Sequence, residues 1–343
     1  GDIVQIINLF FKANLEQKSF DEISQRIGSL KDSAFLMIIP QLFAQITSNE
    51  NSLQSQFVSK LLMKLLPNHF HIILHNLLFY HSPNKTLINL LNWFSTINST
   101  AVTQSMIIHN GLTLSSSTSL EYWIIDIPKA ISAVQKNNFA HAAEILNESL
   151  NRPQQPGETE TEENIRKSFQ SIIQMLLAKR SMRKASSADS LVSTKIDIDD
   201  SPQDNSNENS ENVQISMTRK IIRQLKTIYS NLKAILRNIK SFSLHVIAPE
   251  LFLLRNSVIC VPGTYHINKT KVLIKQFDPT LEIYNSKQRP RFLIIYGNDE
   301  SKHKSLLKGR EDLRLDSRLM QFFKLINQHI GQGLGSFSKK YRQ

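Results

Sequence analysis

Apolar residues recur at helical spacing through the first 245 residues of this sequence. In residues 1–115 the spacing predicts a series of short amphipathic helices joined by polar turns, among them 2–15, 21–30 and 33–46. Pro40 should kink or delimit the third of these helices, because proline has no N–H for the helical hydrogen bond. Helices this short must pack on neighbours to be stable, so the pattern favours a solenoid of helical hairpins.

Four longer apolar patterns predict a second group of helices within residues 116–245. They cover 120–127, 139–150, about 162–179 and 217–241. The segment 183–214 is rich in Ser, Asn and Asp and nearly lacks large apolar residues, which is typical of a disordered insertion. We therefore expect a four-helix bundle over residues 116–245 with a disordered insertion at 183–214.

After Pro249 the apolar period shortens to that of strands. Short β-type runs occur at 258–261, 271–276, 280–284, 292–296 and 305–308, bounded by Pro, Gly, Asn and Asp. Their short connections predict an antiparallel sheet. One helix should follow over 311–327. The predicted fold class is multidomain, α plus α+β: a helical-repeat solenoid, a four-helix bundle, and an antiparallel sheet with one helix.

Composition narrows the classes of function. Ten glycines among 343 residues argue against a Rossmann-type or all-β protein, and a single cysteine excludes a disulfide framework. No apolar run reaches the roughly 18 residues of a membrane span, so we expect no transmembrane segment. The net charge of +12 raises nucleic acid as a partner. We interpret the charge as scattered solvated side chains, including seven Lys or Arg between residues 219 and 240, and expect no nucleic-acid partner.

Two side-chain clusters are candidates for chemistry. His69, His71, His75 and His81 lie close in sequence but have no Cys or carboxylate beside them, so we expect no metal site. The second cluster follows a short apolar run, Leu306 and Leu307, which we interpret as a buried strand that ends at a lysine. It comprises Lys308, Glu311 and Asp316. A lysine that binds phosphates needs a carboxylate to orient it, as in kinases. Spacing alone leaves a solvated strand end as the simpler interpretation.

The amino-acid sequence of that segment resembles a segment of a known protein family. LLKGREDLRLDSRLMQFF (306–323) is similar to the nucleotide-binding lysine segment of the phosphatidylinositol 3-kinase-related protein kinases, in the target of rapamycin (TOR) pattern LLKGxEDLRxDxRxMQ. VPGTY (261–265) and SKQRPR (286–291) match in the family's order, and FLMIIPQLFAQI (35–46) resembles its last helical repeats.

The resemblance implies three domains. Residues 1–115 would be the C-terminal repeats of a FAT-type domain. Residues 116–245 would be a bundle resembling the FKBP–rapamycin-binding (FRB) domain, and 246–343 the N-lobe of a PI3K/PI4K-type kinase domain, without its C-lobe. The expected activity is that of a non-specific serine/threonine protein kinase: transfer of the ATP γ-phosphate to proteins in growth and nutrient signalling.

The resemblance also implies roles for individual residues. Lys308 would bind the phosphates, Asp316 would orient Lys308, and Glu311 would lie near the nucleotide. The loop 285–290 lacks the GxGxxG of ordinary protein kinases. Its Ser286 and Gln288 would donate hydrogen bonds to phosphate. Two side chains would line the adenine: Tyr284 and Leu306.

Cofactors and catalytic capacity follow from the same resemblance. The cofactors would be ATP and Mg²⁺, with the Mg²⁺ ligands in a C-lobe. These 343 residues hold no Asp-Arg-His catalytic loop and no Asp-Phe-Gly, so we expect them to be inactive alone. Other interpretations stay open: a pseudokinase scaffold of the same family, a phosphoinositide kinase, or a helical adaptor.

The implied partners are protein substrates and subunits of a TOR complex of the Lst8 and Raptor kinds. Rapamycin with its FKBP immunophilin should bind weakly or not at all. Tyr229, Lys233 and Leu236 stand where the family has three aromatic residues, and a lysine is costly to bury against an apolar drug. The expected location is cytoplasmic, with peripheral attachment to endomembranes as an option.

Overall fold

The computed structural model describes residues 2–13, 15–80, 83–152, 159–192, 206–311, 315–316, 319–320, 322–323 and 326–327. Two compact units interleave along the chain. The first unit comprises residues 1–112, 250–278 and 293–343, and the second unit comprises 113–249 and 279–292. The unit borders fall close to the expected domain borders near 115 and 245, while the division into three domains stays a prediction.

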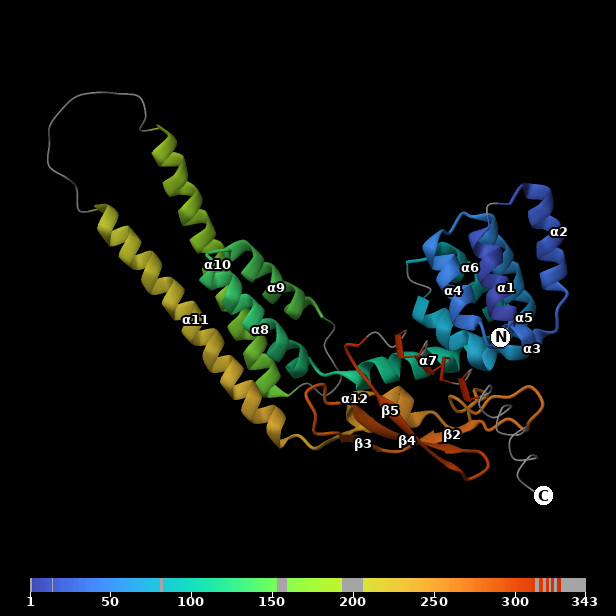
Figure 1. The fold of residues 1–343 in the computed structure, drawn as a ribbon. Helices are drawn as coiled ribbons and strands as arrows, with labels where there is room; N and C mark the ends of the chain where they lie inside the picture. The colour runs from blue at the N-terminus through green and yellow to red at the C-terminus, as the bar shows by residue number, and fades with distance from the viewer. Residues whose placement is uncertain are drawn as a thin grey trace, which may run out of the picture. The chain divides into compact units, whose positions relative to one another are not determined.

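The first unit begins with a run of packed helices (Figure 1). They are α1 (Asp2–Lys12), α2 (Gln17–Gly28), α3 (Asp32–Leu36), α4 (Ile39–Ser48), α5 (Leu53–Tyr80), α6 (Lys85–Ile97) and α7 (Ser99–Ser116), whose end enters the second unit. Helix α5 packs against both α4 and α6, as expected for successive helical hairpins. Pro40 delimits a helix as predicted: it lies in the first turn of α4, so the expected helix 33–46 is two helices.

The helices of the first unit also hold the segment that leads into its strands. Helix α13 (Pro249–Leu253) approaches α7 so closely that the side chain of Leu251 lies over Gly111. Farther on, the amide oxygen of Gln104 accepts hydrogen bonds of 2.8 Å from the Ser257 hydroxyl and the Val258 N–H. The segment that precedes β2 is thereby hydrogen-bonded to a helix as well as to the backbone of β2.

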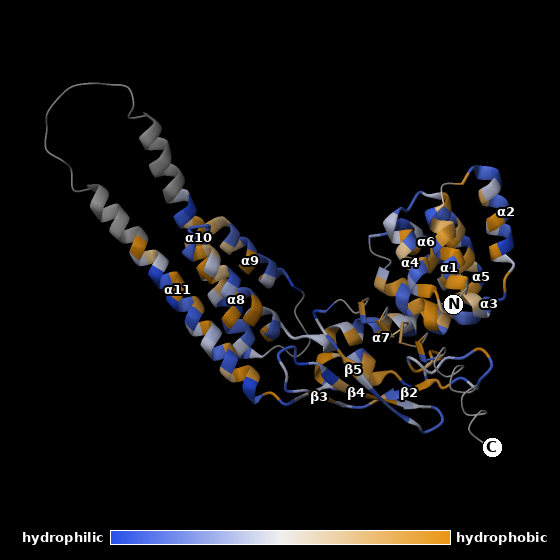
Figure 2. Cartoon of the chain, in the orientation of Figure 1, coloured by the Kyte–Doolittle hydropathy of each residue, from blue (hydrophilic) through white to orange (hydrophobic). Residues whose placement is uncertain are grey.

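The second unit is built on four helices that enclose one apolar core. They are α8 (Ser119–Gln135), α9 (Phe139–Asn151), α10 (Glu160–Val192) and α11 (Ser206–Asn238), which confirms the four predicted helices. Trp123 and Phe169 meet edge to face in the core, with ring centroids 5.6 Å apart, and both are fully buried. Apolar and polar positions alternate around each helix (Figure 2), which explains why helical periodicity was readable from the sequence.

The predicted disordered insertion needs correction at both ends. We expected an unstructured segment over 183–214, but α10 continues to Val192 and α11 begins at Ser206. Once a helix is nucleated on a packed core, each added residue gains a hydrogen bond at little further cost. Composition alone therefore overestimated the length of the segment, of which 193–205 lies outside the described residues.

Five described strands form an antiparallel sheet. They are β1 (Ser241–Ser243), β2 (Ile274–Phe277), β3 (Thr280–Ile283), β4 (Arg291–Gly297) and β5 (Lys302–Leu307). The order is β1-β3-β4-β2, with β5 also pairing with β4. In the second unit, β3 pairs antiparallel with β1 and with the first residues of β4, and a short helix, α12 (Leu244–Ile247), follows β1. In the first unit, β2 pairs antiparallel with the end of β4.

Three expectations about the strands were wrong. Residues 258–261 make only an isolated bridge, between Cys260 and Leu273, because their backbone hydrogen bonds go partly to side chains of helices. The helix expected to reach residue 241 ends at Asn238, and β1 follows, too short to show alternation. Leu306 was expected in a buried strand, yet it is 47% exposed, since the side chains of β5 alternate between exposed and half-buried.

The helix expected over 311–327 is only partly described. Residues 315–316, 319–320, 322–323 and 326–327 are helical, and the others in that range lie outside the described residues.

We predict that Gly111→Ala destabilises the first unit, although alanine is the better helix former by about 1 kcal/mol. A Cβ on residue 111 would lie 2.5 Å from the Leu251 Cβ. Overpacking costs about 1–3 kcal/mol, which outweighs the gain in helix propensity. Leu251 is fully buried, so it cannot turn aside into solvent without losing that burial. Thermal unfolding followed by circular dichroism should therefore show a lower Tm.

The matched control is Asn110→Ala, the exposed neighbour on the same helix, which should leave the Tm nearly unchanged. A Tm for Gly111→Ala equal to or above that of the unsubstituted protein would contradict the close approach of α7 and α13.

Candidate functional site

Lys308 lies immediately after β5, in the first unit, between two carboxylates. Its ammonium donates a hydrogen bond of 2.9 Å to Asp316 Oδ2, and Nζ lies 3.5 Å from Glu311 Oε2. Arg310 has a φ of +62°, so the backbone turns sharply after the strand and brings Glu311 back toward the lysine. The structure thus brings together three of the predicted site residues, while their roles stay a prediction.

The two carboxylates favour the charged form of the lysine. The pKa of Lys308 is raised above its ordinary value, first by the hydrogen bond to Asp316, then by the charge of Asp316, with Glu311 adding to both effects. A group whose pKa is raised on folding stabilises the folded state at pH values below the unfolded pKa. That contribution is lost as pH rises through the folded pKa. The lysine side chain is 35% exposed, so this charge is accessible to a ligand.

The predicted phosphate loop belongs to the second unit and connects β3 to β4. Tyr284 N–H donates to the carbonyl of Pro290 at 2.8 Å, which closes the loop at its base. Within it, Ser286 N–H donates to Tyr284 O at 2.9 Å, and Arg289 N–H donates to Ser286 O at 3.2 Å. Ser286 and Gln288 are exposed, and the half-exposed Tyr284 ring packs edge to face on Phe292. The side chains predicted to contact nucleotide therefore lie on an exposed turn.

A buried carboxylate that sequence reasoning missed holds the end of this loop. Glu121, in the first turn of α8, is 1% exposed. Its Oε1 accepts from Arg289 Nε at 3.0 Å, and its Oε2 accepts from Arg291 Nη2 at 2.6 Å and from the Thr118 N–H at 3.0 Å. The pattern of Thr118 and Glu121 before an apolar run signals a helix start. It carries no information about the two arginines.

The histidine cluster serves packing in the described structure. His69 is buried, with Nδ1 2.7 Å from the Tyr265 hydroxyl and Nε2 3.3 Å from Asp32 Oδ2. His71 Nδ1 accepts a hydrogen bond from the Cys260 N–H. Burial, then Lys271 and His69, lower the pKa of His71 to about 4. Within the part of the chain that the structure describes, no group of three His, Cys, Asp or Glu side chains is arranged to hold a metal; His81 lies outside it.

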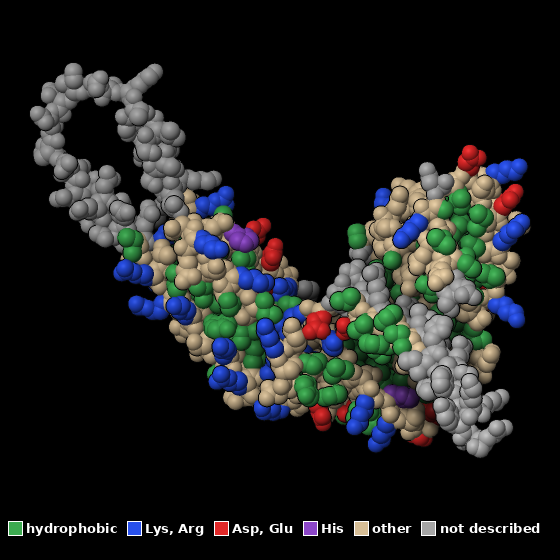
Figure 3. Space-filling model, in the orientation of Figure 1, with side chains coloured by type: hydrophobic (Ala, Val, Ile, Leu, Met, Phe, Trp, Pro, Cys, Tyr) green, Lys and Arg blue, Asp and Glu red, His purple; other side chains and the backbone are tan. Residues whose placement is uncertain are grey.

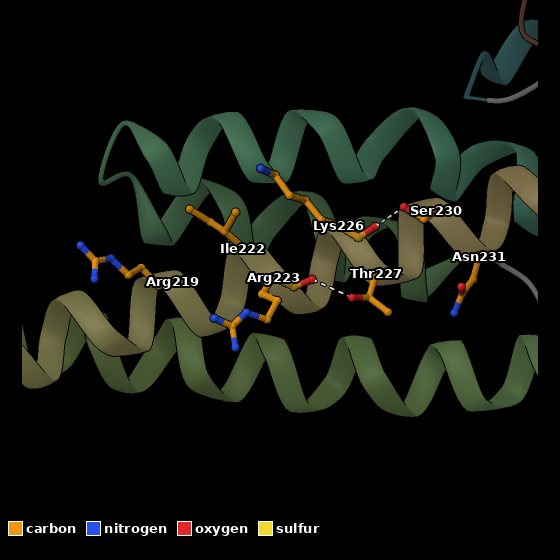
Figure 4. Close-up of a pocket in the computed structure, with 7 residues that line it drawn as sticks. All are labelled: Arg219, Ile222, Arg223, Lys226, Thr227, Ser230 and Asn231. Atoms are coloured by element: carbon orange, nitrogen blue, oxygen red, sulfur yellow. Dashed lines mark hydrogen bonds between the residues drawn. The ribbon is translucent and has the colours of Figure 1, made fainter.

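Helix α11 exposes a basic face, and Figure 3 shows Lys and Arg side chains spread along the bundle. A shallow hollow on this face (Figure 4) is lined by residues of α11 alone: Arg219, Ile222, Arg223, Lys226, Thr227, Ser230 and Asn231. The hydroxyls of Thr227 and Ser230 donate to helix carbonyls four residues earlier, which occupies their hydrogens. We interpret the hollow as a solvated face of the helix.

The residues at the expected drug pocket lie on the same helix, from Tyr229 onward. Lys233 is exposed, with Nζ 5.0 Å from the centroid of the Tyr229 ring, and Leu236 is buried in the bundle core. The lysine ammonium therefore lies over the Tyr229 ring.

Comparison with known proteins identifies relatives of part of the chain. No family model matches. The chain is 42% identical over 100 residues to "Serine/threonine-protein kinase TOR" of Arabidopsis thaliana, covering 29% of this chain and 4% of the relative. It is 46% identical over 92 residues to the protein of that name from Oryza sativa subsp. japonica, covering 27% and 4%. It is 37% identical over 113 residues to "Serine/threonine-protein kinase tor1" of Schizosaccharomyces pombe, covering 33% and 5%.

These matches confirm the resemblance found in the sequence. About 30% of the chain is similar to TOR kinases, and the chain spans about a twentieth of the length of the curated relatives it matches. Among the described helices, none combines the length and apolarity needed to cross a membrane.

We predict that Asp316→Asn lowers the pKa of Lys308, because Asp316 supplies the largest part of the upward shift. NMR titration of ¹³C-methylated lysines in the unsubstituted and substituted chains would measure the change. Glu311→Gln is the matched control and should lower this pKa by a smaller amount. An unchanged Lys308 titration in Asp316→Asn would contradict the pairing.

Proposed function

We propose that this chain is part of a TOR-type serine/threonine protein kinase that transfers the ATP γ-phosphate to protein hydroxyls in growth and nutrient signalling. One observation carries the proposal: a lysine at the end of a strand is held by two carboxylates while part of its surface stays exposed. The relatives are named serine/threonine-protein kinases, which supports protein hydroxyls rather than phosphoinositides as acceptors. A pseudokinase scaffold would have no need for the lysine to be held in this way.

The lysine has the donors that a phosphate ligand requires. An ammonium has three N–H donors; one is donated to Asp316, and Glu311 lies 3.5 Å from Nζ, which leaves at least one donor for a phosphate oxygen of ATP. The two carboxylates keep the ammonium charged and fix its direction, so that its charge is already in place as negative charge develops on the transferred group. Mg²⁺ would neutralise the phosphates when bound, and its ligands are proposed to lie in a C-lobe.

The resemblance supplies the remaining roles. Ser286 and Gln288 would donate hydrogen bonds to the phosphates, and Tyr284 and Leu306 would line the adenine. Exposure of these four side chains is compatible with ligand contact. Protein substrates, Lst8-like and Raptor-like subunits and a cytoplasmic location are further parts of the proposal.

Lys308→Ala should abolish phosphoryl transfer in the full-length protein. Loss of one donor placed to stabilise transition-state charge typically lowers kcat by about 10²–10³-fold. Incorporation of labelled phosphate from [γ-³²P]ATP into a protein acceptor would measure the loss. Lys304→Ala, at an exposed lysine on the preceding strand β5, is the matched control and should retain activity. Equal activity of the two variants would remove Lys308 from the site.

Rapamycin bound to its immunophilin should have little affinity for the bundle. Seating an apolar drug at this position would desolvate the Lys233 ammonium that covers the Tyr229 ring. Lys233→Phe should therefore raise the affinity, as measured by surface plasmon resonance with the drug–immunophilin complex. Lys220→Phe, an exposed lysine elsewhere on α11, is the control. Submicromolar affinity of the unsubstituted protein would show the prediction wrong.

A further inference from the structure

The loop proposed to bind phosphate is held in place by contacts with residues outside the loop. Its residues 285–288 are exposed, and two backbone hydrogen bonds form turns within it: Ser286 N–H to Tyr284 O and Arg289 N–H to Ser286 O. Arg289, at its end, has a φ of +52°, a left-handed conformation that residues other than glycine rarely adopt. Something must therefore hold Arg289 in this conformation, and its side chain is the part that contacts the bundle.

The contacts of the two arginines converge on one carboxylate in the second unit. Glu121 receives Arg289 on one oxygen and Arg291 on the other. Arg289 Nη2 also donates to the carbonyl of Ile239 at 3.2 Å, just past the end of α11. Arg291 Nη1 donates to the carbonyls of Ser116 and Arg289. The loop end is thus fastened to the beginning of α8 and to the chain leaving α11.

We propose that Glu121 is a positioning residue for ATP: through Arg289 and Arg291 it fixes the loop 285–290 in the conformation that receives the phosphates. The inference rests on the proposed function. We call the contacts of Glu121 with Arg289 and Arg291 the anchor. A loop that is ordered before binding loses less conformational entropy when the ligand binds, so the anchor increases the affinity for ATP without touching the nucleotide.

The same contacts argue against a direct role of the two arginines in binding phosphate. Arg291 is fully buried and Arg289 is largely so, and both guanidinium groups face Glu121. Both guanidinium groups are hydrogen-bonded inside the protein, to Glu121 and to backbone carbonyls, so they orient the loop while Ser286 and Gln288 would face the ligand. Interactions that hold substrate and transition state equally change KM more than kcat. The anchor should therefore act on the KM for ATP.

Two substitutions, tested in the full-length protein, break the contact between Glu121 and the loop, one at the carboxylate and one at the arginine. Glu121→Gln removes the buried charge, and Arg289→Gln removes only the loop-side partner, which keeps the test possible if the first variant folds poorly. Asp126→Asn is the matched control: it removes a buried carboxylate of the same helix α8, one that binds Arg152 at 2.9 Å and the Ser149 hydroxyl at 2.8 Å. Glu121→Asp, which keeps the charge, should restore part of the function.

The kinetic readout is the KM for ATP against kcat. Releasing the loop should raise the KM by about tenfold, the effect of losing one hydrogen bond to a charged group, with a smaller change in kcat. Asp126→Asn should leave the KM unchanged, although it also removes a buried, paired carboxylate from α8. An unchanged KM in both anchor variants overturns the inference. So does a lower KM, which would mean that the freed arginines bind phosphate.

A second readout does not depend on activity. Trypsin cleavage after the exposed Lys287, identified by mass spectrometry from peptides beginning at Gln288, reports how mobile the loop is. Cleavage should be at least several-fold faster in Glu121→Gln and Arg289→Gln than in Asp126→Asn. Equal rates in all three overturn the inference even if the protein is a kinase. Faster cleavage in a protein that does not bind ATP would instead retain the anchor and refute the proposed function.

Discussion

The second unit depends on one ion pair taken out of water. Glu121 and Arg291 lie 170 residues apart in sequence, and both side chains are almost completely buried. Taking two charges from water costs several kcal/mol each, and only close contact with further hydrogen bonds offsets that cost. Thr118, Ser116 and Arg289 supply such partners. Removing Glu121 would leave the buried Arg291 guanidinium without a carboxylate, so this ion pair holds the beginning of α8 against the beginning of β4.

Local patterns could be read from the sequence because they depend on neighbours along the chain. Helical periodicity located the four bundle helices, and Pro40 marked a helix boundary. Strand prediction failed where pairing decides the outcome. Residues 258–261 have a strand-like composition, yet α5 and α7 side chains take some of their backbone hydrogen bonds. Strand β1 is specified by its pairing with β3. A segment of three residues is too short to reveal this pairing in its sequence pattern.

The same distinction separates the two halves of the candidate site. Lys308 and Asp316 lie eight residues apart, so a strand, a turn and a helix start are enough to place them together. Glu121 has no such local signature beyond that of a helix start. Its arginine partners are placed by the pairing of β3 with β4, which is a property of the folded chain. A single sequence could therefore suggest the lysine and its acids but could not suggest the anchor.

The connection between helices α10 and α11 can change in length without a change in the stability of the bundle core. Among the described side chains, the apolar core ends at Leu176 on α10 and begins at Met217 on α11, while the helical backbone continues to Val192 and from Ser206. Closing a longer loop costs little additional entropy, because the cost grows only with the logarithm of its length. Insertions or deletions beyond the core should therefore accumulate here without altering the fold, so this connection is suited to variation between related proteins.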